Sequence, residues 1–168
     1  VIPRKVKVFN QRLRVTGTEV DSIGPDDFTD YSDLIELELS GNDIVNITDG
    51  AFANLSQLVN LSLSSNKLSY IPEGAFRGLF SLRSLKLSNN EFQKLSAIVP
   101  SLVSLPSLEF LYLSQNTLGS VSGTDLVPLA NSQLRLLELS NCDLRYIDSS
   151  AFLPLKNLAS LVLSENTM

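Results

Sequence analysis

Residues 58–68 read LVNLSLSSNKL, and five further segments of the chain repeat the same eleven-residue pattern. They are LIELELSGNDI (34–44), LRSLKLSNNEF (82–92), LEFLYLSQNTL (108–118), LRLLELSNCDL (134–144) and LASLVLSENTM (158–168). A weaker copy, NQRLRVTGTEV at 10–20, keeps the core positions Leu13, Val15 and Val20 but has Asn10 and Thr18 in place of the first Leu and the Asn. Repetition of a whole pattern indicates a stack of similar structural units.

The copies begin at residues 10, 34, 58, 82, 108, 134 and 158, so the units are 24 or 26 residues long. The second half of four units repeats an Ile, a Phe and a Leu or Tyr at one spacing: Ile23/Phe28/Tyr31, Ile47/Phe52/Leu55, Ile71/Phe76/Leu79 and Ile147/Phe152/Leu155. The two longer units have the corresponding residues Leu95, Leu102 and Leu105, then Val121, Leu126 and Leu129. Their extra residues, near 96–101 and 130–133, are expected to form enlarged loops.

The spacing of the pattern L-x-x-L-x-L-x-x-N/C-x-L predicts the structure of each unit. Side chains alternate across a strand, so the Leu residues of L-x-L point inward and the residues between them point outward. No single unit can bury its Leu side chains, whereas stacked units cover one another. We therefore expect one α/β leucine-rich-repeat solenoid over residues 1–168. This horseshoe would carry a parallel β-sheet on its concave face, with loops and short helical turns on the convex side.

The residues IPEGAF at 71–76 resemble the typical subclass of leucine-rich repeats found in animal extracellular proteins. Within that subclass, the two 26-residue units and the stretch LVPLANSQLRLLELSNCDL (126–144) resemble Toll-like-receptor ectodomains. This resemblance implies an extracellular, cell-surface receptor ectodomain with a role in innate immune recognition and in receptor homo- or heterodimerisation. Adhesion and extracellular-matrix proteins share the repeat, so a protein of that class is the alternative. An intracellular scaffold is favoured only by the missing disulfides.

Extracellular members of the family usually close both ends of the core with disulfide-bonded caps, but this chain has a single Cys. Residues 1–9, VIPRKVKVF, are expected to form an edge strand with Val6 and Val8 inward. The Ile-Phe-Leu half is missing after the last copy of the pattern. We therefore expect a fragment of a longer ectodomain that self-associates through an uncapped C-terminal edge exposing Leu161, Leu163 and Met168.

The composition argues against catalysis. The chain has no His, which removes His-based triads and the usual zinc sites, and one Cys, which removes intrachain disulfides. We expect no enzyme activity, no metal and no cofactor. The single thiol, Cys142, stands where other copies have Asn, so we interpret it as a buried substitution, with a reactive thiol as the alternative.

The charge of the chain argues against some partners. The net charge is −5 and the isoelectric point is near 4.7, so we expect no nucleic-acid partner and no anionic-membrane partner. Residues 19–49 contain ten acids and no base, but their spacing matches no EF-hand calcium site. This stretch is interpreted as a solvated acidic flank.

The outward strand positions predict two columns on the concave face. The first column is Arg12, Glu36, Asn60, Ser84, Phe110, Leu136 and Ser160, and the second is Arg14, Glu38, Ser62, Lys86, Tyr112, Glu138 and Val162. Ion pairs are expected between the two Arg residues and the two Glu residues at the start of the columns. Apolar side chains ringed by polar ones are usual anchors of interfaces. The candidate ligand patch is therefore Lys86, Phe110, Tyr112, Leu136, Glu138 and Val162, although apolar residues near an exposed end could instead be covered in a longer chain.

Three sequons predict N-glycosylation in a secreted protein, at Asn46, Asn54 and Asn60. Asn60 is an outward strand residue, so a glycan there would occupy the concave face, whereas Asn46 and Asn54 fall on the returning side. The partner expected on the concave face or on a flank is a protein, a glycan or a microbial ligand.

Overall fold

The structure is a computed structural model that describes Ile2 and residues 11–168. The edge strand predicted over residues 1–9, including Val6 and Val8, therefore lies outside the described residues except at Ile2. The Ile2 side chain is buried in the core.

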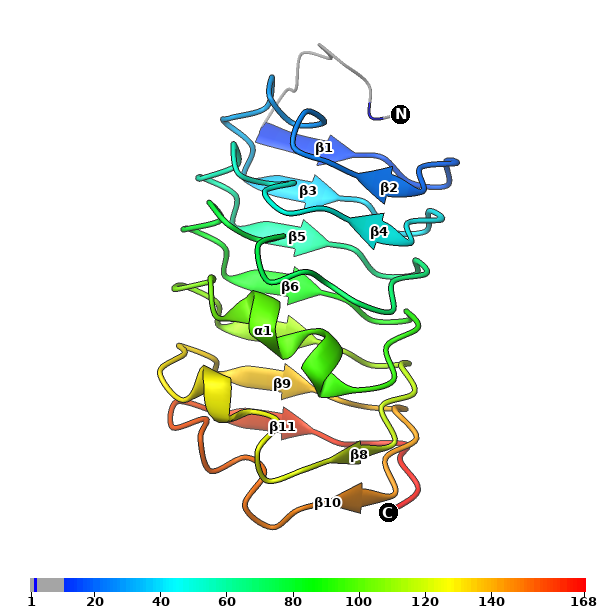
Figure 1. Ribbon diagram of the computed structural model, residues 1–168, viewed down its shortest axis with the longest axis vertical. Helices are drawn as coiled ribbons and strands as arrows, with labels where there is room; N and C mark the ends of the chain where they lie inside the picture. The colour runs from blue at the N-terminus through cyan, green and yellow to red at the C-terminus, as the bar shows by residue number, and fades with distance from the viewer. Residues whose placement is uncertain (1, 3–10) are drawn as a thin grey trace.

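Within the described part of the chain, seven short parallel strands form one sheet, which runs along the stack (Figure 1). They are β1 (Arg12–Arg14), β3 (Glu36–Glu38), β5 (Asn60–Ser62), β6 (Ser84–Lys86), β7 (Phe110–Tyr112), β9 (Leu136–Glu138) and β11 (Ser160–Val162). Each strand pairs in register with the next, so that Leu37 lies beside Leu13 on one side and Leu61 on the other. The expected solenoid with a parallel sheet on one face is confirmed.

Short elements build the opposite side of the stack. Two small parallel sheets join β2 (Ser22–Ile23) to β4 (Asn46–Ile47) and β8 (Ser120–Val121) to β10 (Tyr146–Ile147). The helical segments are η2 (Leu95–Ala97), α1 (Val99–Leu102) and η3 (Val127–Leu129), and Figure 1 shows α1 in front of the large sheet.

The first set of extra residues, near 96–101, forms helical turns instead of the enlarged loop that was expected. Pro100 stands in the first turn of α1, where a missing N–H costs no helical hydrogen bond. Val99 and Leu102 of this helix are buried, so the insertion adds to the core. The second set, near 130–133, lies in turn and loop as expected.

The core runs between the large sheet and the returning halves of the units. The strand residues Leu61 and Leu85 are fully buried. Behind them, Phe28, Phe52 and Phe76 stack, with ring centroids 5.7 and 6.0 Å apart. On the last strand, Leu161 is 36% exposed, and the edge also exposes Met168, whereas Leu163 is half-buried.

A buried Asn side chain ties each of several units to the one before it. The Nδ2 group of Asn66 donates hydrogen bonds to the carbonyls of Leu39 and Leu63, at 3.0 and 2.9 Å. Its Oδ1 atom accepts a hydrogen bond from the N–H of Ile44 at 3.1 Å. Together with Asn66, the buried residues Asn42, Asn90 and Asn116 and the half-buried Asn166 repeat this pattern and form what we term the Asn ladder. The ladder satisfies backbone groups that the strands leave unpaired.

The residue before each ladder position adopts a left-handed backbone conformation. Its φ lies between 51° and 68° at Gly17, Gly41, Ser65, Asn89, Gln115, Asn141 and Glu165. This conformation costs about 1 kcal/mol for a residue other than Gly. Ser65, Gln115 and Glu165 accept that cost without a local preference for the conformation, so the stack imposes the turn geometry in their units.

Cys142 occupies the ladder position of the unit that begins at residue 134, and it is fully buried, as interpreted from the sequence. Its Sγ atom donates to the carbonyl of Leu113 at 3.2 Å, which retains one contact to the preceding unit. Burial raises the pKa of the thiol to about 11. A buried, protonated thiol is a poor nucleophile, so the structure disfavours the alternative of a reactive cysteine.

Removing one ladder side chain should destabilise the fold. We expect Asn66→Ala to lower the free energy of unfolding by about 2–4 kcal/mol, because buried backbone groups lose their partners. Urea denaturation followed by circular dichroism measures this loss. The control Asn54→Ala changes an exposed Asn and should cost less than about 0.5 kcal/mol. Equal losses in the two variants would contradict the importance assigned to the ladder.

The buried thiol predicts both a chemical and a thermodynamic result. Iodoacetamide should leave Cys142 unmodified in the folded protein at neutral pH and should alkylate it in denaturant. The thiol pKa rises on folding from 9.0 to about 11, so the unfolded chain loses this proton first and stability falls as the pH rises through that range. Thermal unfolding measured across this pH range should show a smaller loss of stability in Cys142→Ala than in the unsubstituted chain. Rapid alkylation of the folded protein would contradict the burial.

Candidate ligand-binding surface

The six residues of the candidate patch lie on four neighbouring strands, β6, β7, β9 and β11. In one row, Lys86 lies beside Tyr112, Tyr112 beside Glu138, and Glu138 beside Val162. The Nζ atom of Lys86 is 5.8 Å from the centroid of the Tyr112 ring, which is a cation–π contact. The Oε1 atom of Glu138 accepts a hydrogen bond from the N–H of Ser140 at 3.0 Å.

The second row of the patch is apolar. Phe110 pairs in register with Ser84 on one side and with Leu136 on the other. Phe110 and Leu136 are half-buried, as are Tyr112 and Val162 in the first row. The structure therefore gathers four apolar side chains on one part of the sheet face.

The other half of the sheet face is charged. Arg12 Nε and Glu36 Oε2 are 3.0 Å apart, which confirms the first predicted ion pair. Arg14 and Glu38 are both described and lie beside each other in register, yet no ion pair within 4.0 Å joins them. The prediction of that second pair is wrong, because Glu38 instead accepts a hydrogen bond from the N–H of Ser40 at 3.3 Å.

A shallow hollow of about 500 Å³ lies over the charged half of the sheet face. Its lining runs from Arg12 on β1 to Tyr112 on β7 and includes Lys86. The hollow therefore overlaps the candidate patch at Lys86 and Tyr112, whereas the other four patch residues lie beyond it.

The three sequons lie in different settings. Asn46 belongs to β4 and is exposed, and Asn54 is exposed in a turn of the same unit. Asn60 belongs to β5 on the sheet face, where it is half-buried and its Nδ2 donates to Glu36 Oε1 at 3.5 Å. Glycosylation of these residues stays a prediction.

A second hollow, of about 770 Å³, lies on the side of the stack where the chain enters the strands, and we term it the flank hollow. Its charged residues are Arg83, Glu109 and Arg135, which directly precede β6, β7 and β9. Arg83 Nη2 is 2.6 Å from Glu109 Oε1, and Arg135 Nη1 is 3.9 Å from Glu109 Oε2. The two columns predicted from the sequence contain only outward strand residues. They therefore did not include Arg83, Glu109 and Arg135. Alternating Arg, Glu and Arg at the second position of the repeated pattern is the signal that could have found them.

Two exposed groups have shifted pKa values, and neither lies in these hollows. An ion pair of 2.7 Å with Asp43 raises the pKa of Lys67. Hydrogen bonds from Ser150 lower the pKa of the Asp148 carboxyl. Across the described residues, no group of three or more Cys, Asp or Glu side chains is placed to hold a metal ion. The same part of the chain contains no helix with the length and apolar character needed to span a membrane.

The comparison with protein families gives a match to the leucine rich repeat, over residues 11–68, 32–92 and 56–118. Among solved structures, the chain is similar to the one described as "Crystal structure of TLR13-ssRNA13 complex", with a TM-score of 0.83 and 30% identity. That match covers 94% of this chain and 22% of the TLR13 chain, so this chain spans about a fifth of the length of that protein. The comparison with curated protein sequences gives no match.

The family matches overlap and together extend over residues 11–118, which is more than half of the chain. Altogether, 358 chains of solved structures match this fold, so its shape alone does not identify a ligand. The chain resembles a piece of a Toll-like-receptor ectodomain. The repeated motif, the stacked parallel sheet and the family match together show that this chain belongs to the leucine-rich repeat family.

Proposed function

We propose that this chain is a non-catalytic ligand-recognition module of an extracellular receptor and that it serves innate immune pattern recognition. The repeats and the likeness to a piece of TLR13 support a ligand-binding module. The observation that carries the proposal is the apolar patch of Phe110, Tyr112, Leu136 and Val162 on the sheet face.

The geometry of the patch suits binding. The side chains stand on hydrogen-bonded strands, so little backbone conformational entropy is lost when a ligand binds. Phe110 and Tyr112 are half-buried, which fixes their rings while leaving part of each open to a partner. Aromatic anchors of this kind commonly contribute much of the binding energy of an interface. Lys86 supplies a polar group at the margin, and Glu138 supplies one between Tyr112 and Val162.

The charge of the patch favours a protein, a glycan or another microbial ligand over a nucleic acid. Lys86 and Glu138 cancel each other, and the chain as a whole carries a net charge of −5. Nucleic-acid binding usually depends on several Lys or Arg contacts to phosphates. The TLR13 structure contains ssRNA, and an RNA ligand is therefore the contrasting outcome in a binding experiment.

An extracellular location and receptor dimerisation belong to the same proposal. The exposed sequons at Asn46 and Asn54 lie away from the strands of the large sheet, so glycans there would leave the patch accessible. A glycan at Asn60 would instead project from β5, two strands from the patch residue Tyr112 on β7, and would direct the partner toward β7, β9 and β11.

The patch predicts which substitutions weaken binding. The immobilised chain is tested against a single-stranded RNA, bacterial cell-wall glycans and extracellular proteins by a biosensor. For the ligand that binds, Tyr112→Ala and Phe110→Ala should each lower the affinity about tenfold or more without loss of fold. Tyr146→Ala changes an exposed Tyr on β10 and is the matched control. Full affinity in both patch variants would remove the patch from consideration.

The proposed location predicts glycans. After expression with a signal peptide in animal cells, peptide mass spectrometry should find glycan at Asn46 and Asn54, where the folded chain leaves space. Asn46→Gln and Asn54→Gln should each remove one glycan without a change in the unfolding midpoint, because both side chains are exposed. Absence of glycan at all three sequons would contradict an extracellular role.

A further inference from the structure

We propose that the flank hollow is a second binding surface, which takes an acidic protein segment with a carboxylate next to an aromatic or aliphatic side chain. The hollow shares no residue with the patch on the sheet face, so this proposal does not depend on the proposed function. It rests on the arrangement of charge in the hollow, on one open guanidinium group and on one exposed aromatic ring.

The charged residues of the hollow form a fixed column. The N–H of Glu109 donates to the carbonyl of Arg83 at 2.9 Å, and the N–H of Arg135 donates to the carbonyl of Glu109 at 2.8 Å. These backbone bonds hold the three residues at the spacing of neighbouring strands, about 4.8 Å. Two positive side chains therefore flank one negative side chain, which leaves the column with one net positive charge in a chain whose net charge is −5.

The two Arg side chains of the column are not equivalent. The Nε and Nη2 atoms of Arg83 both contact Glu109 Oε1, at 2.8 and 2.6 Å, and the Glu109 side chain is only 16% exposed. The negative charge of Glu109 is therefore paired mainly with Arg83. Arg135 contacts that carboxylate through one nitrogen at 3.9 Å, and its side chain is 63% exposed. Its remaining N–H groups face solvent and can bind a carboxylate in the two-pronged geometry that guanidinium favours.

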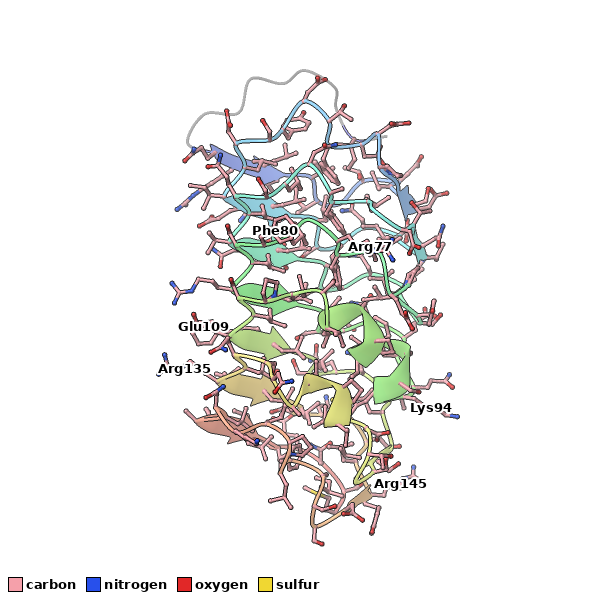
Figure 2. The ribbon with its side chains drawn as sticks, turned by 60° about the vertical axis from the view of Figure 1, so that its left-hand side comes forward. Arg77, Phe80, Lys94, Glu109, Arg135 and Arg145 are labelled. Atoms are coloured by element: carbon pink, nitrogen blue, oxygen red, sulfur yellow. The ribbon has the colours of Figure 1, made fainter. Side chains whose placement is uncertain are left out.

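An exposed aromatic ring lies in the same hollow. Phe80 is 63% exposed, although its backbone is held in place by the Oγ of Ser107, which donates to the Phe80 carbonyl at 2.8 Å. The N–H of Phe80 also donates to the carbonyl of Gly78 at 2.9 Å. Figure 2 shows Phe80, Glu109 and Arg135 at successive levels of the stack. Within this one hollow, an apolar surface on a fixed backbone and an open guanidinium two strands further along the stack suit a partner segment that carries both an apolar side chain and a carboxylate.

The balance of charge favours an acidic protein segment over a nucleic acid. Apart from the two Arg residues, no base among the described residues lines the hollow, and Glu109 would repel a phosphate chain. Affinity for nucleic acids depends on several cationic contacts, whereas one net positive charge suits a single carboxylate. The volume of about 770 Å³ accommodates a few side chains of a partner, and the amides of Gln133 and Asn157 at the rim can bond to its backbone.

A defined peptide tests this proposal. The probe is the blocked peptide acetyl-Asp-Glu-Phe-Glu-Asp-amide, titrated into the full chain by calorimetry and by NMR. Its neutral counterpart, acetyl-Asn-Gln-Phe-Gln-Asn-amide, is titrated in the same way. We expect the acidic peptide to bind with a Kd on the order of 0.1–1 mM and the neutral peptide to bind about tenfold more weakly or not at all. No binding of the acidic peptide, or equal binding of both peptides, would overturn the proposal.

Matched variants locate the binding. Arg135→Glu should lower the affinity for the acidic peptide about tenfold, and Phe80→Ala about threefold or more. Arg145→Glu makes the same change of charge on an exposed Arg outside the hollow and should alter the affinity less than about twofold. Circular dichroism checks that each variant is folded. Equal losses in Arg135→Glu and Arg145→Glu would show attraction to the overall charge and would overturn the proposal.

Two further measurements assign the occupant. Binding of a thirteen-nucleotide oligouridylate that Arg135→Glu abolishes would assign the hollow to RNA and overturn the proposal. Self-association in analytical ultracentrifugation that Arg135→Glu abolishes would assign it to a second copy of this chain, with the same consequence. Tyr112→Ala should leave the affinity for the peptide unchanged, because Tyr112 does not line the flank hollow. Failure of this proposal is therefore distinguishable from failure of the patch on the sheet face.

Discussion

Hydrogen bonding of the buried Asn side chains to the backbone of two successive units is the interaction on which the rest of the structure depends. Each amide bonds to carbonyls of its own unit and of the preceding one, as Asn66 does with Leu63 and Leu39. This contact aligns the units, and the alignment places outward side chains in columns. Both candidate surfaces are sections of such columns, so their geometry follows from the stacking and not from the loops.

The parts of this molecule that follow a strict period are predictable from sequence. Alternation in L-x-L predicts the buried Leu61 and the outward Asn60, and the recurrence of the pattern predicts which residues become neighbours, although Ser62, at an outward position, is also buried. The helical turns of η2 and α1 were not predictable, because an insertion outside the repeated pattern can pack in several ways. The sequence also could not show that Glu38 bonds to the Ser40 N–H instead of Arg14, since both choices fit the same backbone.

The two surfaces differ in the way neighbouring units contribute to them. The patch on the sheet face combines side chains from the strands themselves, whose backbones are held by hydrogen bonds on both sides at β6, β7 and β9 and on one side at β11. The flank hollow combines residues just before the strands with Phe80, Ser107 and Asn157 from the preceding turns. Arg83, Glu109 and Arg135 stand at the second position of the repeated pattern, where the residue type varies between units. A column of alternating charge could therefore arise there without disturbing the core.

The substitution at Cys142 has a consequence for the cooperativity of unfolding. A thiol is a weak hydrogen-bonding group, so the contact from Cys142 to Leu113 couples its two units less strongly than an Asn does. Repeat arrays open where neighbouring units are weakly coupled, and the thiol weakens the coupling across the interface between β7 and β9. Tyr112 and Glu138 lie on opposite sides of it, as do Glu109 and Arg135. A ligand on either surface would therefore bridge this interface and suppress the opening of the solenoid into two blocks.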